Sequence, residues 1–363
     1  MKKSLTVGVI GSHSALDICA GVKAYGFKNL VITEKGRDKT YGHYYFNKNG
    51  IGCVDECISV NKFDELLQPS LQKKLKEKNV IFIPHRSFEV YLNFNYEAIE
   101  NNFPIPIFGN RFLLKIEERG ARPNQYDILE KANIRYPTQF KNPNNIDKLC
   151  LVKVLEKERK FERAFFLVES YQDYNRQVKK KLKDGIFAKK QIEEAVIEEF
   201  IVGVHINFHY FYSPLTKRLE LMGTDTRRQT NSEGLTRLPA NYQLEALKKM
   251  DIKYEEAGHI AVTVLESMLE PALMLGEQFV QTTQKLYPPG IIGPFALQSI
   301  IIPGPPKKEI IVVDVSPRMP GSPGISATPY MRYLYGKPMS VGERIGFEIS
   351  EALKMNKLHT ILT

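Results

Sequence analysis

The feature that most constrains this chain is a series of short apolar runs in its first third, each followed by a polar turn. The runs cover residues 5–10, 29–33, 80–83 and 105–108, and a helical pattern over 15–25 separates the first two. Uninterrupted apolar strands that alternate with helices are typical of a parallel sheet buried between helices. In an open parallel sheet, ligands bind where the carboxyl ends of the strands meet, so these turns are the first candidate site.

The turns hold side chains that suit an anionic ligand. His13 follows the first run, and His85 and Arg86 follow the third. Imidazole and guanidinium groups can bind an anion, helped by backbone N–H groups at the helix start after Gly11. Polar loop residues that face water explain the same pattern, so the turns alone do not decide between the two.

The rest of the chain predicts two further units. We expect an α/β and α+β protein with an N-terminal parallel domain over 1–123, a small lobe over 124–203 and a C-terminal mixed-sheet lobe over 204–363. In the small lobe, strands are expected over 151–155, 164–168 and from 195, with a helix over 171–183. In the last lobe, strands are expected over 206–212, 219–222, 295–302 and 309–315, and helices over 259–286, broken at Pro271, and 340–355.

Composition excludes several classes of protein. The chain has 363 residues with 51 Lys and Arg against 41 Asp and Glu, and acidic residues interrupt its basic stretches, so a nucleic-acid partner is not expected. No apolar run approaches the roughly 18 residues of a membrane helix, so no membrane partner is expected either. Four cysteines without a second pair near Cys53 and Cys57 predict a reducing compartment and no zinc site. No cleavable leader is evident, and we expect a cytoplasmic protein.

Ionisable side chains interrupt apolar strands in the small lobe. Lys153 stands inside one strand, and Glu198 and Glu199 close another. Burying a charge is costly without a partner, so a ligand with phosphate, amino and hydroxyl groups would suit them. A solvent-facing lysine and solvated acids on an edge strand remain alternatives. His205 and His209 are four residues apart and therefore face the same side of their strand. We expect them to be surface residues rather than metal ligands.

Two oxygen-bearing side chains lie on the last two predicted strands. Gln298 and Asp314 have apolar neighbours on both sides. Mg²⁺ takes few protein ligands and prefers hard oxygens, so the pair could hold a metal that bridges phosphates. A hydrogen-bonded Gln–Asp pair in the core is the alternative.

Nine short segments carry a resemblance to a known family. They are GSHSAL at 11–16, KGRD at 35–38, PHRSF at 84–88, FGNR at 108–111, IEEFIVG at 197–203, HYFYSP at 209–214, PPGIIGPF at 288–295, LQS at 297–299 and GKPMSVG at 336–342. In this order they resemble ATP-grasp enzymes, and more closely the formate-dependent FAICAR synthetase family of archaeal purine biosynthesis. The resemblance covers nearly the whole chain.

The resemblance implies a reaction and its participants. ATP phosphorylates formate, the 5-amino group of AICAR ribonucleotide attacks the formyl phosphate, and FAICAR, ADP and phosphate leave. It also implies Mg²⁺ or Mn²⁺ as cofactor and a homo-oligomer, a trimer or hexamer. Two other functions stay open: an ATP-grasp ligase with a different acid or amine, and a nucleotide-binding paralogue with weakened catalysis.

The resemblance also assigns residues to roles. For AICAR it implies Gly11, Ser12, His13, Ser87, Asn231 and His259. For ATP it implies Lys153, Glu198, Glu199, Phe200, Ile201 and Gln229, with the backbone near Phe200 on the adenine. The metal ligands would be Gln298 and Asp314, and Lys153 and Arg318 would be catalytic by neutralising the transferring phosphate.

Several positions depart from the family pattern. Gln229 and Asp314 stand where Glu is expected, His259 stands where Asn is expected, and a further expected Asn falls within 320–324. We expect a divergent subgroup with the same reaction, because lysine, acids and metal-type oxygens still occur together.

The largest departure is a loop without glycine at 154–163. Glycine lets backbone N–H groups approach phosphate, whereas this loop offers the side chains of Lys157, Arg159 and Lys160. We predict that the loop closes over ATP through at least one of these cations.

Overall fold

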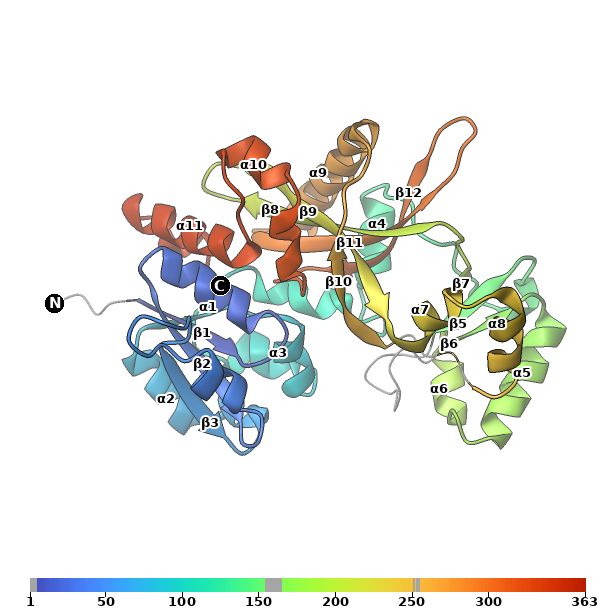
Figure 1. Ribbon diagram of the computed structural model, residues 1–363, viewed down its shortest axis with the longest axis horizontal. Helices are drawn as coiled ribbons and strands as arrows, with labels where there is room; N and C mark the ends of the chain where they lie inside the picture. Colours follow the sequence, from blue (N-terminus) through green and yellow to red (C-terminus); the bar gives the residue numbers. More distant parts are fainter. Residues whose placement is uncertain (1–4, 154–164, 251, 253–254) are drawn as a thin grey trace.

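The computed structural model describes residues 5–153, 165–250, 252 and 255–363. Figure 1 shows the N-terminal domain and the small lobe at opposite ends of the molecule, with a long antiparallel sheet between them. The predicted lid loop at 154–163 lies outside the described residues. None of the described helices combines the length and the apolar character needed to cross a bilayer.

The N-terminal domain holds the predicted parallel sheet. Its strands are β1 (Thr6–Ile10), β2 (Lys28–Glu34), β3 (Glu56–Val60) and β4 (Val80–Phe82), in the order β3-β2-β1-β4. All three pairings are parallel, which confirms the prediction. Helices α1 (Ala15–Ala24), α2 (Pro69–Glu77) and α3 (Arg86–Tyr91) connect and cover the strands.

One predicted strand of this domain is wrong. Residues 105–108 form only isolated bridges, such as Ile107 with Phe82, because Pro104 and Pro106 have no N–H to extend a ladder. The sequence also missed β3, which pairs with β2 at the opposite edge of the sheet; its half-exposed side chains gave no continuous apolar run.

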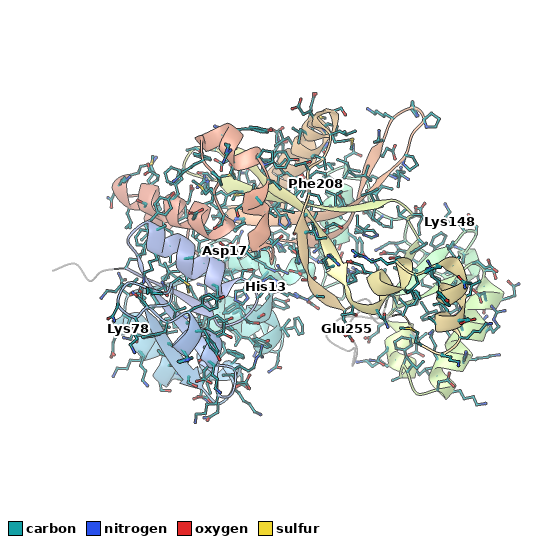
Figure 2. The ribbon with its side chains drawn as sticks, in the orientation of Figure 1. His13, Asp17, Lys78, Lys148, Phe208 and Glu255 are labelled. Carbon is teal, nitrogen blue, oxygen red and sulfur yellow. The ribbon has the colours of Figure 1, made fainter. Side chains whose placement is uncertain are left out.

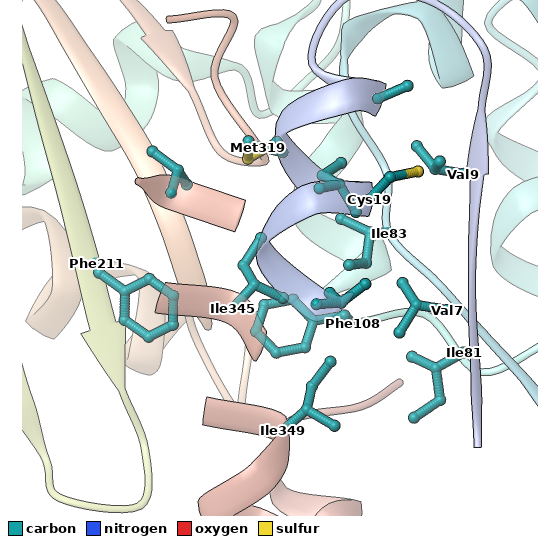
Figure 3. Close-up of a cluster of buried hydrophobic side chains, with 14 of the residues drawn as sticks. Val7, Val9, Cys19, Ile81, Ile83, Phe108, Phe211, Met319, Ile345 and Ile349 are labelled. Carbon is teal, nitrogen blue, oxygen red and sulfur yellow. The ribbon is translucent and has the colours of Figure 1, made fainter. Parts of the chain in front are cut away.

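The two ends of the chain share one core. Helix α11 (Val341–Lys354) lies against α1, and a Cβ at Gly21 or Gly342 would overlap the backbone of the other helix. Figure 3 shows Ile345 and Ile349 of α11 in the same cluster as Val7 of the parallel sheet. This packing fixes the N-terminal turns relative to the C-terminal lobe.

The small lobe is a three-stranded antiparallel sheet in the order β6-β5-β7. Its strands are β5 (Cys150–Lys153), β6 (Phe165–Val168) and β7 (Val196–Glu199), covered by α5 (Tyr171–Lys183) and α6 (Lys189–Glu193). Its hydrophobic core includes the buried Ile146 and the partly buried Phe140. The preceding helix α4 (Gln125–Lys131) packs instead into the core of the C-terminal lobe.

The C-terminal lobe is built on a five-stranded antiparallel sheet in the order β10-β9-β8-β11-β12. The strands are β8 (Val204–Ser213), β9 (Arg218–Gln229), β10 (Glu256–Ala261), β11 (Gly293–Ile302) and β12 (Glu309–Ser316). The helices are α7 (Thr230–Thr236), α8 (Ala240–Leu247), α9 (Leu269–Leu286) and α10 (Tyr330–Tyr335). Short 3-10 or π turns include Thr40–Tyr44, Phe63–Leu67, Ala98–Asn102, Arg111–Glu117 and Pro323–Ala327.

The predicted helix over 259–286 is wrong in its first third. His259 lies on strand β10, and α9 begins only at Leu269. Pro271 therefore stands in the first helical turn, where its missing N–H removes no intrahelical hydrogen bond, and it does not break the helix.

Candidate active site

A row of polar side chains crosses the five-stranded sheet at one level. Asp225 of β9 pairs in register with Asn207 of β8, Asn207 pairs with Gln298 of β11, and Gln298 pairs with Asp314 of β12. Directly paired residues point to the same face of a sheet. The row therefore runs over three strand spacings, roughly 14 Å. We call these four residues the polar row.

The end of the polar row at β12 is organised as a pair of free oxygens. Gln125 Nε2 and Arg119 Nη2 both donate to Asp314 Oδ1, at 2.9 and 3.1 Å. Gln298 Nε2 donates to Ser316 Oγ at 3.2 Å. Among the described residues, no donor reaches Asp314 Oδ2 or Gln298 Oε1.

This donor set fits a magnesium ion. The described part of the chain has no cluster of three His, Cys, Asp or Glu side chains that could hold a metal alone. Mg²⁺ is usually bound by one or two protein oxygens together with substrate phosphates, so the two free oxygens suffice. The prediction that Gln298 and Asp314 face each other is confirmed. Their role as ligands stays a prediction.

A chain of charged and polar groups joins this end to the small lobe. Lys153 Nζ forms an ion pair with Glu198 Oε1, and Tyr126 Oη donates to Glu198 Oε2 at 2.9 Å. Arg119 Nε donates to Tyr126 Oη at 3.3 Å, while its Nη2 reaches Asp314. Burial lowers the pKa of Lys153, although Glu198, which is only 2% exposed, opposes that shift.

The predicted adenosine contacts follow at the end of β7. Glu198 is paired with Lys153, whereas Glu199 is half-buried and its Oε2 accepts from Thr138 N at 3.3 Å. A contact of Glu199 with a ribose stays a prediction. Phe200 N donates to Leu149 O at 2.9 Å. Val202 is 75% exposed, and the backbone from Ile201 to Val202 bonds to none of the described residues. That free edge is what an adenine ring would need.

Two further predicted residues lie where β9 runs into α7. Gln229 ends β9, and its backbone N–H donates to Glu233 Oε1 at 2.9 Å. Asn231 stands in the first turn of α7, half-buried.

The opposite side of the site is made by the N-terminal turns. His85 caps helix α3: its Nδ1 accepts from Ser87 N at 3.2 Å, and its Nε2 donates to Ile10 O at 2.9 Å. Both ring nitrogens are therefore used by the backbone, and desolvation by burial lowers the pKa of His85 to about 4. Its ring stacks on His13 at 5.4 Å between centroids. The predicted Gly11 and Ser12 lie in the same turn.

His13 occupies an unusual place in that turn. Its backbone has a φ of 51°, which non-glycine residues rarely adopt, and its side chain stays accessible to solvent. Desolvation by the surrounding protein, with the nearby His85, Arg318 and His259, holds the pKa of His13 well below its usual value. A Cβ at Gly321 would come within 2.5 Å of the His13 ring. Figure 2 shows His13 where the N-terminal domain meets the C-terminal lobe.

The polar row ends on this side at a buried carboxylate. Asp225 Oδ2 lies 2.8 Å from His259 Nδ1 and 3.2 Å from His209 Nε2, and it accepts from Ser322 Oγ. Burial alone would raise the pKa of Asp225, but the two imidazoles lower it. His259 Nε2 donates to Glu256 Oε1 at 2.8 Å; burial opposes the charge of His259, but the two acids raise its pKa to about 9.

The expectation of a surface pair at His205 and His209 is half wrong. His205 is exposed, but His209 is only 3% exposed. Its Nε2 lies 3.2 Å from the buried Asp225 of the neighbouring strand.

Arg318 is more tightly held than expected for a free catalytic cation. Its Nη2 donates to Glu117 Oε1 at 2.7 Å, and its Nε lies 3.7 Å from Glu89 Oε1. Arg86 contacts the same two acids, with its Nη1 3.3 Å from Glu89 Oε2 and its Nε 3.6 Å from Glu117 Oε1. Desolvation and Glu117 raise the pKa of Glu89 to about 8. A catalytic role of Arg318 stays a prediction.

Five residues of this arrangement were missed from the sequence: Arg119, Gln125, Tyr126, Asn207 and Asp225. Asn207 and Asp225 carried a usable signal, since each is a polar residue inside a run of strand residues. Arg119 precedes helix α4, Gln125 and Tyr126 stand in its first turn, and only the fold brings these three to the site.

The chain is similar to proteins of one family over its full length. It is 34% identical, over 364 aligned positions, to the 5-formaminoimidazole-4-carboxamide-1-(beta)-D-ribofuranosyl 5'-monophosphate synthetase of Methanocaldococcus jannaschii, covering 100% of this chain and 96% of the relative. The synthetase of Methanopyrus kandleri is 33% identical, covering 99% and 96%. Family models described as a protein of unknown function (DUF1246) and a domain of unknown function (DUF1297) match residues 7–140 and 173–363.

Solved structures show the same relationship. The IMP biosynthesis protein PurP from Thermococcus kodakaraensis is 27% identical, with a TM-score of 0.73 over 98% of this chain and 100% of that one. An ADP complex of N5-carboxyaminoimidazole ribonucleotide synthetase shares the fold at 12% identity, with a TM-score of 0.59 over 93% of this chain and 78% of that one. The similarity covers the full length of the chain, and the fold is that of ATP-grasp enzymes. The protein therefore belongs to the family of 5-formaminoimidazole-4-carboxamide ribonucleotide (FAICAR) synthetases.

Proposed function

We propose that this protein uses ATP and formate to formylate AICAR ribonucleotide, giving FAICAR, ADP and phosphate. The observation that carries the proposal is the polar row, because it runs in a single line from Asp314, next to the ion-paired Lys153, to Asp225, which contacts His209 and His259. The family membership of the chain supports the product, and the ADP-bound neighbour supports the nucleotide.

At the nucleotide end, this chain's residues bind and orient ATP. Lys153 contacts the phosphates, Glu199 the ribose, and the exposed backbone from Ile201 to Val202 the adenine edge. A Mg²⁺ ion held by Gln298 and Asp314 would neutralise charge on the phosphates. An oxygen of formate attacks the γ-phosphorus as the bond to ADP breaks, a step that needs mainly positioning and electrostatic stabilisation.

At the other end, His13 and the turn at Ser87 hold AICAR. Both imidazoles of this turn are neutral at physiological pH, so His13 can exchange a hydrogen bond with the substrate without carrying a charge. The 5-amino nitrogen attacks the formyl carbon, the carbon–oxygen bond to phosphate breaks, and the departing phosphate takes the amine proton.

A direct assay tests this function. ADP release is measured with ATP, formate and AICAR, with each component omitted in turn, and the product is identified by mass spectrometry. We expect FAICAR only in the complete mixture. ADP release with AICAR but without formate would contradict the proposal and favour a ligase with a different acid. A homo-oligomer, which light scattering can test, stays a prediction.

A further inference from the structure

The middle of the polar row has no assigned function. Asn207 lies one strand spacing, about 5 Å, from Asp225 on one side and from Gln298 on the other. The His13 and His259 side and the metal-type oxygens thus flank it in opposite directions. A group that passes along the row from the Asp314 end to the Asp225 end crosses this position.

The carboxamide of Asn207 is held in one orientation. Its Nδ2 donates to Asp225 Oδ1 at 2.6 Å, and Asp225 is itself fixed by Ser322, His209 and His259. Because the amide nitrogen is fixed on Asp225, the carbonyl oxygen is turned away from it, toward the Gln298 side. Among the described residues no donor reaches Asn207 Oδ1, and one Nδ2 hydrogen remains unused. The residue is 8% exposed, whereas Asp225 is fully buried, so its free groups are the accessible part of the pair.

We propose that Asn207 is a substrate-binding residue for the small carboxylic acid and for the acyl phosphate formed from it. The inference deepens the proposed function and rests on it. The unused Nδ2 hydrogen donates to a carboxylate oxygen of the acid. Asp225 acts as a positioning residue, because it sets which way the amide points.

An amide suits this position chemically. It donates a hydrogen bond to a carboxylate, yet it is neither basic nor nucleophilic, so it cannot be acylated by the acyl phosphate as a lysine, cysteine or activated serine could. The acid oxygen forms its bond to the γ-phosphorus while Asn207 holds the other oxygen. When the amine attacks the carbon, that second oxygen stays in the formyl product and the first leaves with phosphate.

The test is a comparison of Asn207→Ala with Ser299→Ala. Ser299 neighbours Gln298 on β11 and faces the opposite side of the sheet, where its hydroxyl donates to Ile206 O at 2.7 Å. Both variants lose a hydrogen bond in the same sheet, but only Asn207→Ala changes the polar row. Steady-state kinetics with each substrate varied in turn, calorimetric binding of AICAR, and thermal unfolding are measured for both.

We expect Asn207→Ala to lower kcat/KM for formate about 10- to 100-fold, the range for removing a buried hydrogen-bond partner. AICAR binding and the KM for ATP should change less than threefold, and Ser299→Ala should leave all three substrates unaffected. Equal losses for all substrates, or no change for formate, would overturn the inference. If Asn207→Ala unfolds, Asn207→Ser, which keeps a donor for Asp225, takes its place under the same criteria. A parent protein without formate-dependent activity would instead overturn the proposed function.

Discussion

The Asp314 end of the polar row and the N-terminal turns treat their ionisable groups in opposite ways. At the nucleotide end, cations and anions are paired, as in the chain from Lys153 through Glu198 to Arg119 and Asp314. At the turns, His13 and His85 lose their charge instead. An imidazole can release its proton near neutral pH, whereas a buried lysine or arginine needs an acid beside it.

Substitutions in the two places should therefore differ in cost. Removing a member of a charge chain leaves an uncompensated charge in a buried place, which is costly. Removing a neutral imidazole leaves only an unpaired polar group, which costs less. We therefore expect larger losses at the nucleotide end than at the turns.

The largest effect is expected for Asp314→Asn. It removes the carboxylate that faces Gln298 and frees Arg119 from its ion pair. We expect kcat to fall on the order of 10²- to 10³-fold, with a higher Mg²⁺ requirement and unchanged AICAR binding by calorimetry. Glu309→Gln is the matched control, since it also loses an arginine partner, Arg135, at the far end of the same strand. Similar losses in both variants would contradict the site.

A smaller, selective effect is expected for His13→Ala. AICAR binding should weaken by roughly 1–3 kcal/mol, the range for leaving a buried polar partner unpaired, while ATP binding stays unchanged. Isothermal calorimetry with each ligand measures both. The exposed His359, changed to Ala, serves as the control. Unchanged AICAR affinity in His13→Ala would remove the turns from the substrate site.

His85→Asn tests whether the turns depend on a neutral imidazole. Asn can still cap helix α3 but loses the bond to Ile10 O and the stack on His13. The folded-state pKa of about 4 lies below the usual 6.5, so the unfolded chain takes up the proton first as the pH falls. Stability contributed by His85 is complete above pH 6.5 and is lost progressively toward pH 4.

Thermal unfolding of both proteins between pH 7.5 and pH 4 checks this sign. We expect the parent protein to unfold at a higher temperature than His85→Asn at pH 7.5. The difference between the two unfolding temperatures should narrow as the pH falls. Other groups, such as Asp17, titrate equally in both proteins, so the difference isolates His85. If the difference in unfolding temperature does not change with pH, His85 is not held neutral.

The smallest effect is expected from a single methyl group. Gly321→Ala places a Cβ against the His13 ring, whereas a Cβ at Gly324 meets no atom within 4 Å. Because the ring is the end of a side chain, it can shift, and we expect AICAR affinity to fall only several-fold. Gly324→Ala should leave it unchanged. Equal affinities in the two variants would show that the position of His13 does not matter for binding.

The sequence was most informative where one periodicity dominated. The strands near 5–10 and 29–33 and the helices near 171–183 and 340–355 agree with β1, β2, α5 and α11 within a few residues. Apolar runs and caps such as Ser340 are local signals, so they can be read without the fold. The start of α9 was missed because the stretch after His259 contains apolar residues at helical as well as strand spacing.

The site was predictable only in part, for a physical reason. The sequence predicted two neighbouring antiparallel strands, and from these it followed that Gln298 and Asp314 face each other. The commitment of Glu198 to Lys153 and of Arg318 to Glu117 depends on distances between segments far apart in the chain. The sequence motifs indicated that these residues matter. They did not show which charge each residue would neutralise.

The proposed reaction requires that one oxygen of formate leaves with the phosphate. Formate labelled with ¹⁸O at both oxygens, together with ATP and AICAR, tests it in one turnover, with the phosphate analysed by mass spectrometry. The acyl phosphate route predicts one ¹⁸O atom in each phosphate released and the other in the formyl group of the product. Unlabelled phosphate alongside a formylated product would contradict the acyl phosphate route.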